Sequence, residues 1–318
     1  MKRNMTNKMK YLALGFMACA AMVSCNKDDD PVPSKPTIEN LEIGSGNNGI
    51  GMIGRDFHLN MDIIAGELIE TVAVQLRQRS DEEYAHEWSH EITWEEYRGV
   101  KNANVHKHFD IPGDAAEGLY DFVIIVNDKN GTTLEEAKEI KLIDPSKLPV
   151  DPTMSVFNLR RKVGDGDFER IYSMLEGFVD PTNNTFHKGD HLEGLASVSN
   201  LRDNGSLYLL LIKKSMGHKP ETVDDIDFSK AIVCDALVHE NIKERRSVSN
   251  FLLLTEWGER ERPEFMIGAT EDNNIPAPSP IDGDKAWENG AYYFGVVYTN
   301  STHNLSTHYY VELTINGF

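Results

Sequence analysis

Residues 118–131 read Gly-Leu-Tyr-Asp-Phe-Val-Ile-Ile-Val-Asn-Asp-Lys-Asn-Gly, an apolar stretch that ends in a polar cluster. Tyr120 to Val126 has the length and the β-branched and aromatic content of a buried strand, and Asn127 to Gly131 has the composition of a turn. After the turn, residues 138–143 alternate between apolar and polar types, as a half-buried strand does. This stretch therefore predicts antiparallel β structure.

The residues before this stretch carry further strand signals. Phe57 to Ile63 places apolar residues at every second position, and Ile69 to Leu76 has a similar pattern. Proline-rich segments at 30–36 and 144–152 bracket these strands, and closely spaced prolines continue neither a helix nor a central strand. We therefore predict a β-sandwich over residues 36–145 and a domain boundary behind it.

The second half of the chain resembles the first. Residues 290–298 repeat the glycine, tyrosine and apolar pattern of 118–126, and a closing alternating strand follows at 309–315. A polar segment at 256–286 has no counterpart in the first half and reads as an insertion. The predicted fold class is all-β, with two tandem immunoglobulin-like β-sandwich domains, of which the second, residues 151–318, is enlarged by insertions.

The first residues have the features of a secretory signal. Four basic residues lie within the first ten, and Tyr11 to Val23 is apolar and free of charge. This run is about 13 residues long, whereas a helix that spans a bilayer needs about 20. Met22-Val23-Ser24-Cys25 resembles a lipobox, so we expect removal of residues 1–24, lipid on Cys25 and a tether over residues 25–35. The alternative is an ordinary signal peptide followed by an incidental cysteine.

Lys27-Asp28-Asp29, directly after Cys25, resembles the export signal of surface lipoproteins of Bacteroidota, although the same residues would also make a solvated tether. We therefore expect a protein held by lipid in the outer membrane and exposed on the cell surface.

Charge and cysteine content narrow the possible partners. Lys and Arg number 32 and Asp and Glu number 51, which gives a net charge of −19 that becomes −23 after loss of the signal. So acidic a chain repels phosphate backbones, so we exclude nucleic acid as a partner. The mature chain keeps Cys25 and Cys234, of which the first carries lipid, so no intramolecular disulfide is expected.

The segment Val105-His106-Lys107-His108 carries the strongest signal for chemistry. On a strand, residues i and i+2 point to the same face about 6.5–7 Å apart, so two imidazoles can hold one metal ion. Imidazole suits zinc, copper and iron. The alternative is a pair of solvent-facing histidines on an outer strand face. The other candidate ligands in the first half are His58, His86 and His90, with Glu87, Glu91 or Asp110 as oxygen donors.

His86-Glu87-Trp88-Ser89-His90 also matches the His-Glu-x-x-His pattern of zinc metalloproteases. A protease needs this pattern inside a partly apolar helix, whereas acidic residues flank it here. We therefore interpret the segment as a charged loop, with a protease zinc site as a remote alternative. In the second half, His191 and His239 stand where a repeat would place His58 and His106, and no His-x-His recurs there.

Several short motifs of the first half occur together in a known family. They are Pro36-Thr37-Ile38, Phe57-His58-Leu59, the polar stretch that contains tryptophan, the block from Val105 to Pro112, Gly118-Leu119-Tyr120 and the turn Asn127 to Gly131. On these motifs, residues 36–143 resemble a lipoprotein module of Bacteroidota, the domain of unknown function 4625 family. The resemblance implies an immunoglobulin- or cadherin-like sandwich and carries no assigned activity.

We therefore expect a non-catalytic binding module for a glycan, a peptide or a partner protein. Trp88, Trp94 and Tyr97 could present rings to a sugar. The alternative function is transition-metal binding through the histidines of the first half. The sequence holds no phosphate-binding glycine loop, no Gly-x-Ser-x-Gly and no Cys-x-x-Cys, so we do not expect an enzyme.

Overall fold

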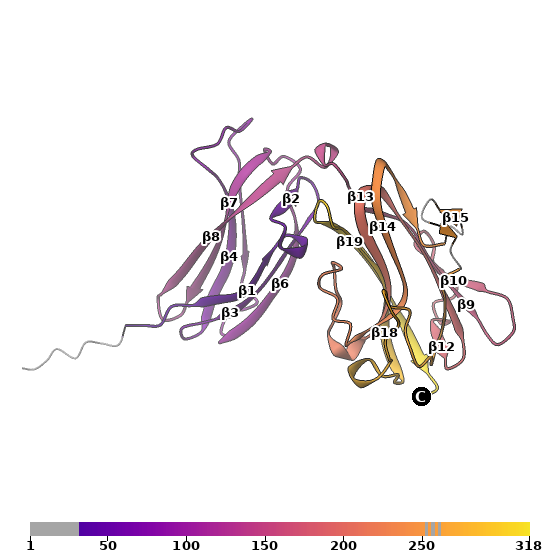
Figure 1. Ribbon diagram of the computed structural model, residues 1–318. Coiled ribbons are helices and arrows are strands. Elements are labelled where there is room, and N and C mark those ends of the chain that lie inside the picture. The colour runs from indigo at the N-terminus through magenta and orange to yellow at the C-terminus, as the bar shows by residue number, and fades with distance from the viewer. Residues whose placement is uncertain (1–31, 252–253, 256–257, 260–261) are drawn as a thin grey trace, which may run out of the picture. The chain divides into compact units, whose positions relative to one another are not determined.

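The computed structural model describes residues 32–251, 254–255, 258–259 and 262–318 (Figure 1). Ser34–Phe318 forms one compact unit, which contains the strands described below. Within the described residues, the helices are short 3-10 turns, and none of them is long and apolar enough to cross a membrane. The predicted all-β class is confirmed. The predicted signal peptide and Cys25, the predicted site of lipidation, lie outside the described residues.

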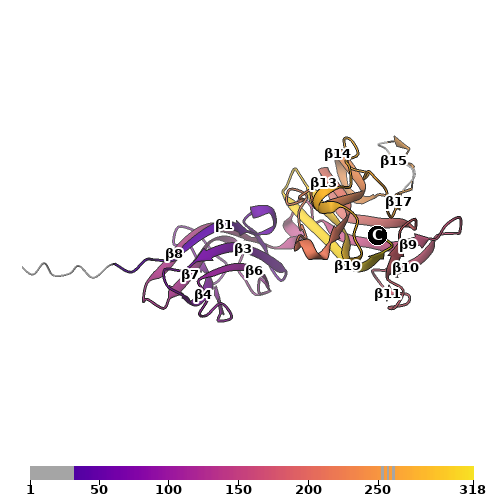
Figure 2. The same cartoon turned by 90° about the horizontal axis from the view of Figure 1, so that it is seen from below.

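The first half contains two sheets. Strands β1, β3 and β6 form one sheet in that order, and β2, β8, β7, β4 and β5 form the other. Figure 2 labels β1, β3 and β6 of the first sheet and β8, β7 and β4 of the second. Strand β2 runs parallel to β8, while the other neighbours are antiparallel. The bounds are β1 Thr37–Ile43, η1 Ser45–Asn47, β2 Ile50–Met52, β3 Asp56–Ile64, β4 Ile69–Gln78, β5 Ser89–Trp94, β6 Asn102–Asp110, β7 Gly118–Asp128 and β8 Thr133–Ile143.

This strand order is that of an immunoglobulin-type sandwich. If β1, β3 and β6 are strands A, B and E, then β4, β7 and β8 are C, F and G. The core lies between the sheets, where Phe57 of β3 contacts Phe122 of β7 with ring centroids 5.6 Å apart. The alternation predicted for 57–63 is confirmed, because Phe57, Leu59, Met61 and Ile63 are all buried in this core.

The second half is built around one long strand. Its bounds are η2 Pro145–Lys147, β9 Thr153–Lys162, β10 Glu169–Ser173, β11 Gly177–Phe178, β12 Thr185–His187, β13 His191–Lys213, η3 Lys214–Met216, β14 Ala231–Ser249, β15 Leu254–Thr255, β16 Gly258–Glu259, β17 Glu264–Met266, η4 Gly283–Lys285, β18 Gly290–Asn300 and β19 Leu305–Asn316.

Strand β13 takes part in both layers of this half. Its first part, His191 to Ser199, pairs with β9, and its last part, Ser206 to Lys213, pairs with β18. Between them the register with β14 shifts repeatedly, and Asn200 and Asp203 have positive φ angles, so the strand bends there. Phe157 of β9 then faces Phe294 of β18 with centroids 5.6 Å apart, which closes a core between the two layers.

The connectivity supports the predicted duplication. Strand β12 runs parallel to the last strand β19, as β2 does to β8, and β9 pairs with β13 as β1 pairs with β3. The two halves also share a tyrosine corner. Tyr120 Oη donates to Ala116 O at 2.8 Å, and Tyr292 Oη donates to Glu288 O at 3.0 Å, each four residues upstream.

One correspondence drawn from the sequence is wrong. His239 lies on β14. Strand β14 pairs with the last part of β13, just as β5 pairs with β4 in the first half. Strand β14 therefore corresponds to β5, and His239 is not equivalent to His106 on β6. Strand β17 takes the place of β6, because it pairs with the first part of β13. The β10–β11 hairpin is a further addition to this half, which the sequence did not predict.

The segment between the halves is folded. Asp144 caps η2 by accepting a hydrogen bond from Ser146 N at 2.9 Å, and Leu148 and Val150 are buried against Leu305. Within the described residues, no strand pairing joins β1–β8 to β9–β19. Because Ser34–Phe318 forms one compact unit, the separation into two independent domains stays a prediction.

Candidate metal centre

The pairing of β3 with β6 brings three histidines together. His58 lies directly opposite His108, and His106 follows two positions along β6 on the same face. The ring centroids of His58, His106 and His108 are separated by 5.0, 5.1 and 5.4 Å. The same-face geometry predicted for His106 and His108 is present, and it includes His58.

These histidines lie on the outer face of the first sandwich. Phe57 and Leu59 point into the core, so the alternation of β3 turns His58 outward. His58 is nevertheless only 6% exposed, whereas the side chains of His106 and His108 are 48% and 37% exposed. A side chain from the second half, Glu221, lies against all three rings.

The loop that carries Glu221 is held firmly. Tyr310 Oη of β19 donates to Pro220 O at 2.6 Å, and Val223 N donates to Thr299 Oγ1 of β18 at 2.9 Å. Thr222, which follows Glu221 directly, is almost fully buried, and its Oγ1 donates to Asp225 Oδ2 at 2.8 Å. The backbone on both sides of Glu221 is therefore held by contacts of the neighbouring residues.

The four donor groups are spaced as ligands of one ion would be. Glu221 Oε2 is 3.1 Å from His58 Nδ1, and Glu221 Oε1 is 3.0 Å from His108 Nε2 and 3.7 Å from His106 Nε2. One ligand atom from each of the four residues lies within 4.8 Å of the others. Four bonds of about 2.0–2.1 Å in a tetrahedron place neighbouring ligand atoms about 3.3–3.4 Å apart. The separations between Glu221 and the histidines are close to this spacing, and the four ligand atoms as a set would need to draw together to hold a zinc-sized ion.

A second layer of carboxylates supports the rings. Asp56 Oδ2 lies 2.6 Å from His108 Nδ1, and Glu42 Oε2 lies 3.5 Å from His58 Nε2. Gly46 N donates to Glu42 Oε1 at 2.9 Å and fixes that carboxylate. A carboxylate on the far nitrogen of a ligand histidine orients the ring and increases its basicity, and it accompanies most metal-bound histidines.

Three buried polar atoms of the cluster make no hydrogen bond. They are His58 Nδ1, His58 Nε2 and Glu221 Oε2, which face partners at ion-pair distance without hydrogen-bond geometry. Buried polar groups are normally satisfied, and each exception needs a physical reason. A cation between His58 Nδ1 and Glu221 would satisfy two of the three.

The neighbouring carboxylates raise the pKa values of His58 and His108. Burial opposes protonation of His58, but Glu221 and Glu42 together outweigh it and raise its pKa to about 9. Asp56, followed by Glu221, raises the pKa of His108 to about 10. Burial alone would raise the pKa of Glu221, but His108 and His58 hold it well below its usual value. Without a metal, the cluster is a network of imidazolium and carboxylate groups.

Two further histidines at the cluster favour the neutral form. Burial, and then the charge of His58, lower the pKa of His106. Burial also lowers the pKa of His308, which lies on β19 and interacts electrostatically with Glu221 and His108. His106 can therefore offer a free lone pair near neutral pH at no cost in deprotonation.

The structure does not bring His86 and His90 to this cluster. His86 Nε2 contacts Asp114 O at 2.9 Å, and His90 lies on β5, at the edge of the other sheet, where its ring stacks on Trp88. The expected completion of the shell by His86 or His90 is therefore wrong. The predicted oxygen donors Glu87, Glu91 and Asp110 are likewise absent from the donor group.

The metalloprotease pattern lacks the helix that it requires. Residues 85–88 form bends and irregular structure, and residues 89–94 form strand β5. His86 lies in a bend and His90 lies on β5, so the two side chains are not presented one helical turn apart as the protease zinc site requires.

Sequence reasoning missed Glu42, Asp56 and Glu221. The position of Asp56, two residues before His58 on the same strand face, could have been read from the alternation of β3. Glu221 has no such signal, because it lies in an irregular loop 113 residues after His108.

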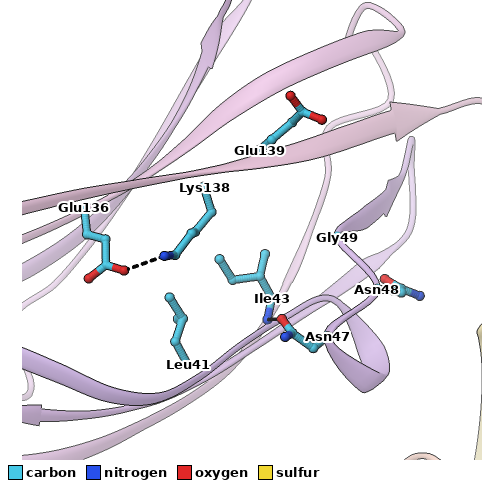
Figure 3. A pocket seen from close by; sticks show the side chains of 8 residues that line it. All are labelled: Leu41, Ile43, Asn47, Asn48, Gly49, Glu136, Lys138 and Glu139. Carbon is cyan, nitrogen blue, oxygen red and sulfur yellow. Dashed lines mark hydrogen bonds and ion pairs between the residues drawn. The ribbon is translucent and has the colours of Figure 1, made fainter.

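A separate pocket of about 460 Å³ opens between β1 and β8 and contains none of these histidines (Figure 3). Leu41 and Ile43 form its apolar wall, and Lys138 pairs with Glu136 at 2.9 Å across its opposite side. Asn47, Asn48, Gly49 and Glu139 complete the lining. It has no donor set for a transition metal.

Comparison with known proteins supports the assignment of the first half alone. Residues 23–143 match the model of the family described as Domain of unknown function (DUF4625), which confirms the resemblance noted above. No curated protein matches the chain. The three histidines, Glu42 and Asp56 lie inside the matched segment, whereas Glu221 lies outside it.

Proposed function

We propose that this protein binds a transition-metal ion, preferentially zinc, through His58, His106, His108 and Glu221. The observation that carries the proposal is the convergence of four donors at ligand spacing around buried polar atoms that make no hydrogen bond. Three imidazoles and one carboxylate suit zinc, and imidazole-rich sites also accept copper and iron. Four protein donors fill a tetrahedral shell, which favours a binding role over catalysis.

Elemental analysis of protein purified without a histidine tag tests this proposal. We expect one equivalent of zinc in the wild type and none in a His106→Ala, His108→Ala double variant. Both side chains face away from the core, so the variant keeps its fold, which circular dichroism checks. A His86→Ala, His90→Ala double variant is the matched control and keeps its zinc. Metal affinity no tighter than millimolar in the wild type would contradict the proposal.

We further propose that the mature chain is held in the outer membrane, on the cell surface, by lipid on Cys25. The lipobox-like Met22-Val23-Ser24-Cys25 and the acidic residues behind it support this location. A Cys25→Ala variant should leave the membrane fraction. Retention of a processed variant in the membrane would contradict the anchor. The net negative charge continues to argue against nucleic acid as a partner.

A second candidate function is the binding of a glycan, peptide or protein partner without catalysis. It is favoured by an open hollow beside Trp88 and His90, whose rings stack with centroids 6.0 Å apart. The other aromatic candidates are less available, because the Lys107 amine lies over the rings of both Trp94 and Tyr97. Glycan-array binding that is lost on Trp88→Ala would support this function, and no binding by the wild type to glycans or to peptides would count against it.

A further inference from the structure

We infer that the bound ion is a structural clamp that fastens the second half of the chain onto the first. This inference rests on the proposed function and assigns a role to the same site. The contacts between residues 34–143 and 153–318, together with the folded segment between them, are called the junction below. The ion would join the two sides of this junction directly.

The ligands come from both sides of the junction. His58, His106 and His108 are fixed by the pairing of β3 with β6 in the first half. Glu221 is fixed by β18 and β19 of the second half, through the contacts of its loop with Thr299 and Tyr310. Neither half alone supplies the full donor set. An ion held by all four residues must therefore link two separately folded sheets.

The rest of the junction has an apolar and a polar part. In the apolar part Leu148, Val150 and Leu305 are buried, and Ile50, Met52 and Ile143 are partly buried against them. In the polar part, Arg55 pairs with Asp151 through two contacts of 2.5 and 2.8 Å, with side chains that are 43% and 15% exposed. The remaining contacts include the hydrogen bond from Asn48 Nδ2 to Asn304 O, 2.9 Å.

A divalent ion at the centre suits the polar groups of the cluster. The carboxylates of Glu42, Asp56 and Glu221 all point at the histidines. An ion bound by Glu221 satisfies its buried oxygen, which otherwise makes no hydrogen bond. Because its four bonds form fully in the closed junction alone, the ion binds the closed form more tightly and shifts the population toward it.

Trypsin provides a reporter of junction opening. Lys147 is exposed, but the next residue, Leu148, is 5% exposed and packs in the apolar cluster of the junction. Cleavage of the Lys147–Leu148 bond therefore requires Leu148 to leave that cluster, and its rate follows the population of the open junction. Mass spectrometry identifies this cut among the others.

The experiment compares the purified full chain with zinc and with a chelator. We expect zinc to slow cleavage after Lys147 by about ten- to a hundredfold, the ratio of its affinities for the closed and open forms. Glu221→Gln keeps the three histidines, so it still binds zinc but weakly, and zinc no longer protects Lys147. Because zinc binding and closure of the junction are coupled, the factor by which Glu221→Gln lowers the zinc affinity should equal the factor by which it lowers the protection of the Lys147–Leu148 bond by zinc. Glu312→Gln, an exposed carboxylate of the same half, is the control.

The outcomes separate the two proposals. Stoichiometric zinc binding, slower cleavage, and loss of protection in Glu221→Gln alone would support the clamp. Stoichiometric zinc binding with unchanged cleavage after Lys147 would overturn the clamp and leave the metal site standing. No zinc binding by the wild type would overturn both.

Discussion

The affinity of the site for zinc should depend steeply on pH above neutrality. Zinc binds neutral imidazole, so each protonated ligand must lose its proton when the ion enters. His58 and His108 have pKa values raised to about 9 and about 10, whereas the pKa of His106 is lowered. Between pH 7 and pH 8.5 the rings of His58 and His108 in the empty site therefore each carry one proton more than the neutral imidazole, and zinc binding releases these two protons.

Two released protons give an apparent association constant that rises about a hundredfold per pH unit in this range. Histidines with the ordinary pKa of about 6.5 would instead give an affinity that is nearly independent of pH above 7. The charge of the cluster is the same before and after binding, because one divalent ion replaces two protons.

Competition against a chromophoric chelator of known pH dependence measures the association constant across pH 7 to 8.5. Calorimetry in two buffers that differ in ionisation enthalpy counts the protons independently. A slope near zero, with no proton released, would refute the raised pKa values that the ion pairs of His58 and His108 imply.

Three further predictions address the surrounding structure. In metal-free protein, the raised pKa values of His58 and His108 mean that their protonated rings stabilise the junction, fully below the unfolded pKa of about 6.5. This stabilisation is lost as the pH rises through about 9 to 10, so trypsin cleavage after Lys147 should accelerate in that range unless zinc is present. Tyr120→Phe and Tyr292→Phe each remove a corner hydrogen bond and should lower the free energy of unfolding by about 1 kcal/mol in urea denaturation, a test that fails if neither midpoint moves. Asp56→Asn removes the main cause of the raised pKa of His108, so the number of protons released on zinc binding should fall from two toward one in the same calorimetry, and an unchanged count would contradict this cause.

Strand patterns were predictable from the sequence because alternation reports local geometry. The period of two at 57–63 identified β3 and its buried face, and the spacing of His106 and His108 gave their shared face correctly. The sequence also located the repeated glycine–tyrosine strand, because the tyrosine corner needs residues that are close in the chain.

The errors arise where geometry depends on distant residues. His86 and His90 match a spacing that has meaning on a helix, but their segment supplies an edge strand to the opposite sheet, so spacing alone misplaced them. His239 was misassigned because β13 is one continuous strand, whereas a loop separates the equivalent strands β3 and β4 in the first half. Counting residues along the chain therefore places the later positions of the second half wrongly. Glu221 meets the histidines through tertiary packing, which no local pattern encodes.

The bent strand β13 has a consequence for how the second half unfolds. In the first half, the chain passes from β3 of one sheet to β4 of the other through a loop, so no strand belongs to both sheets. One sheet can therefore open, and its amide hydrogens can exchange, while the hydrogen bonds of the other sheet stay intact. In the second half, β13 and its partner β14 carry an unbroken ribbon of backbone from one layer into the next (Figure 1). Amide hydrogens on both layers should therefore exchange with one common opening energy in the second half, and with two distinct energies in the first.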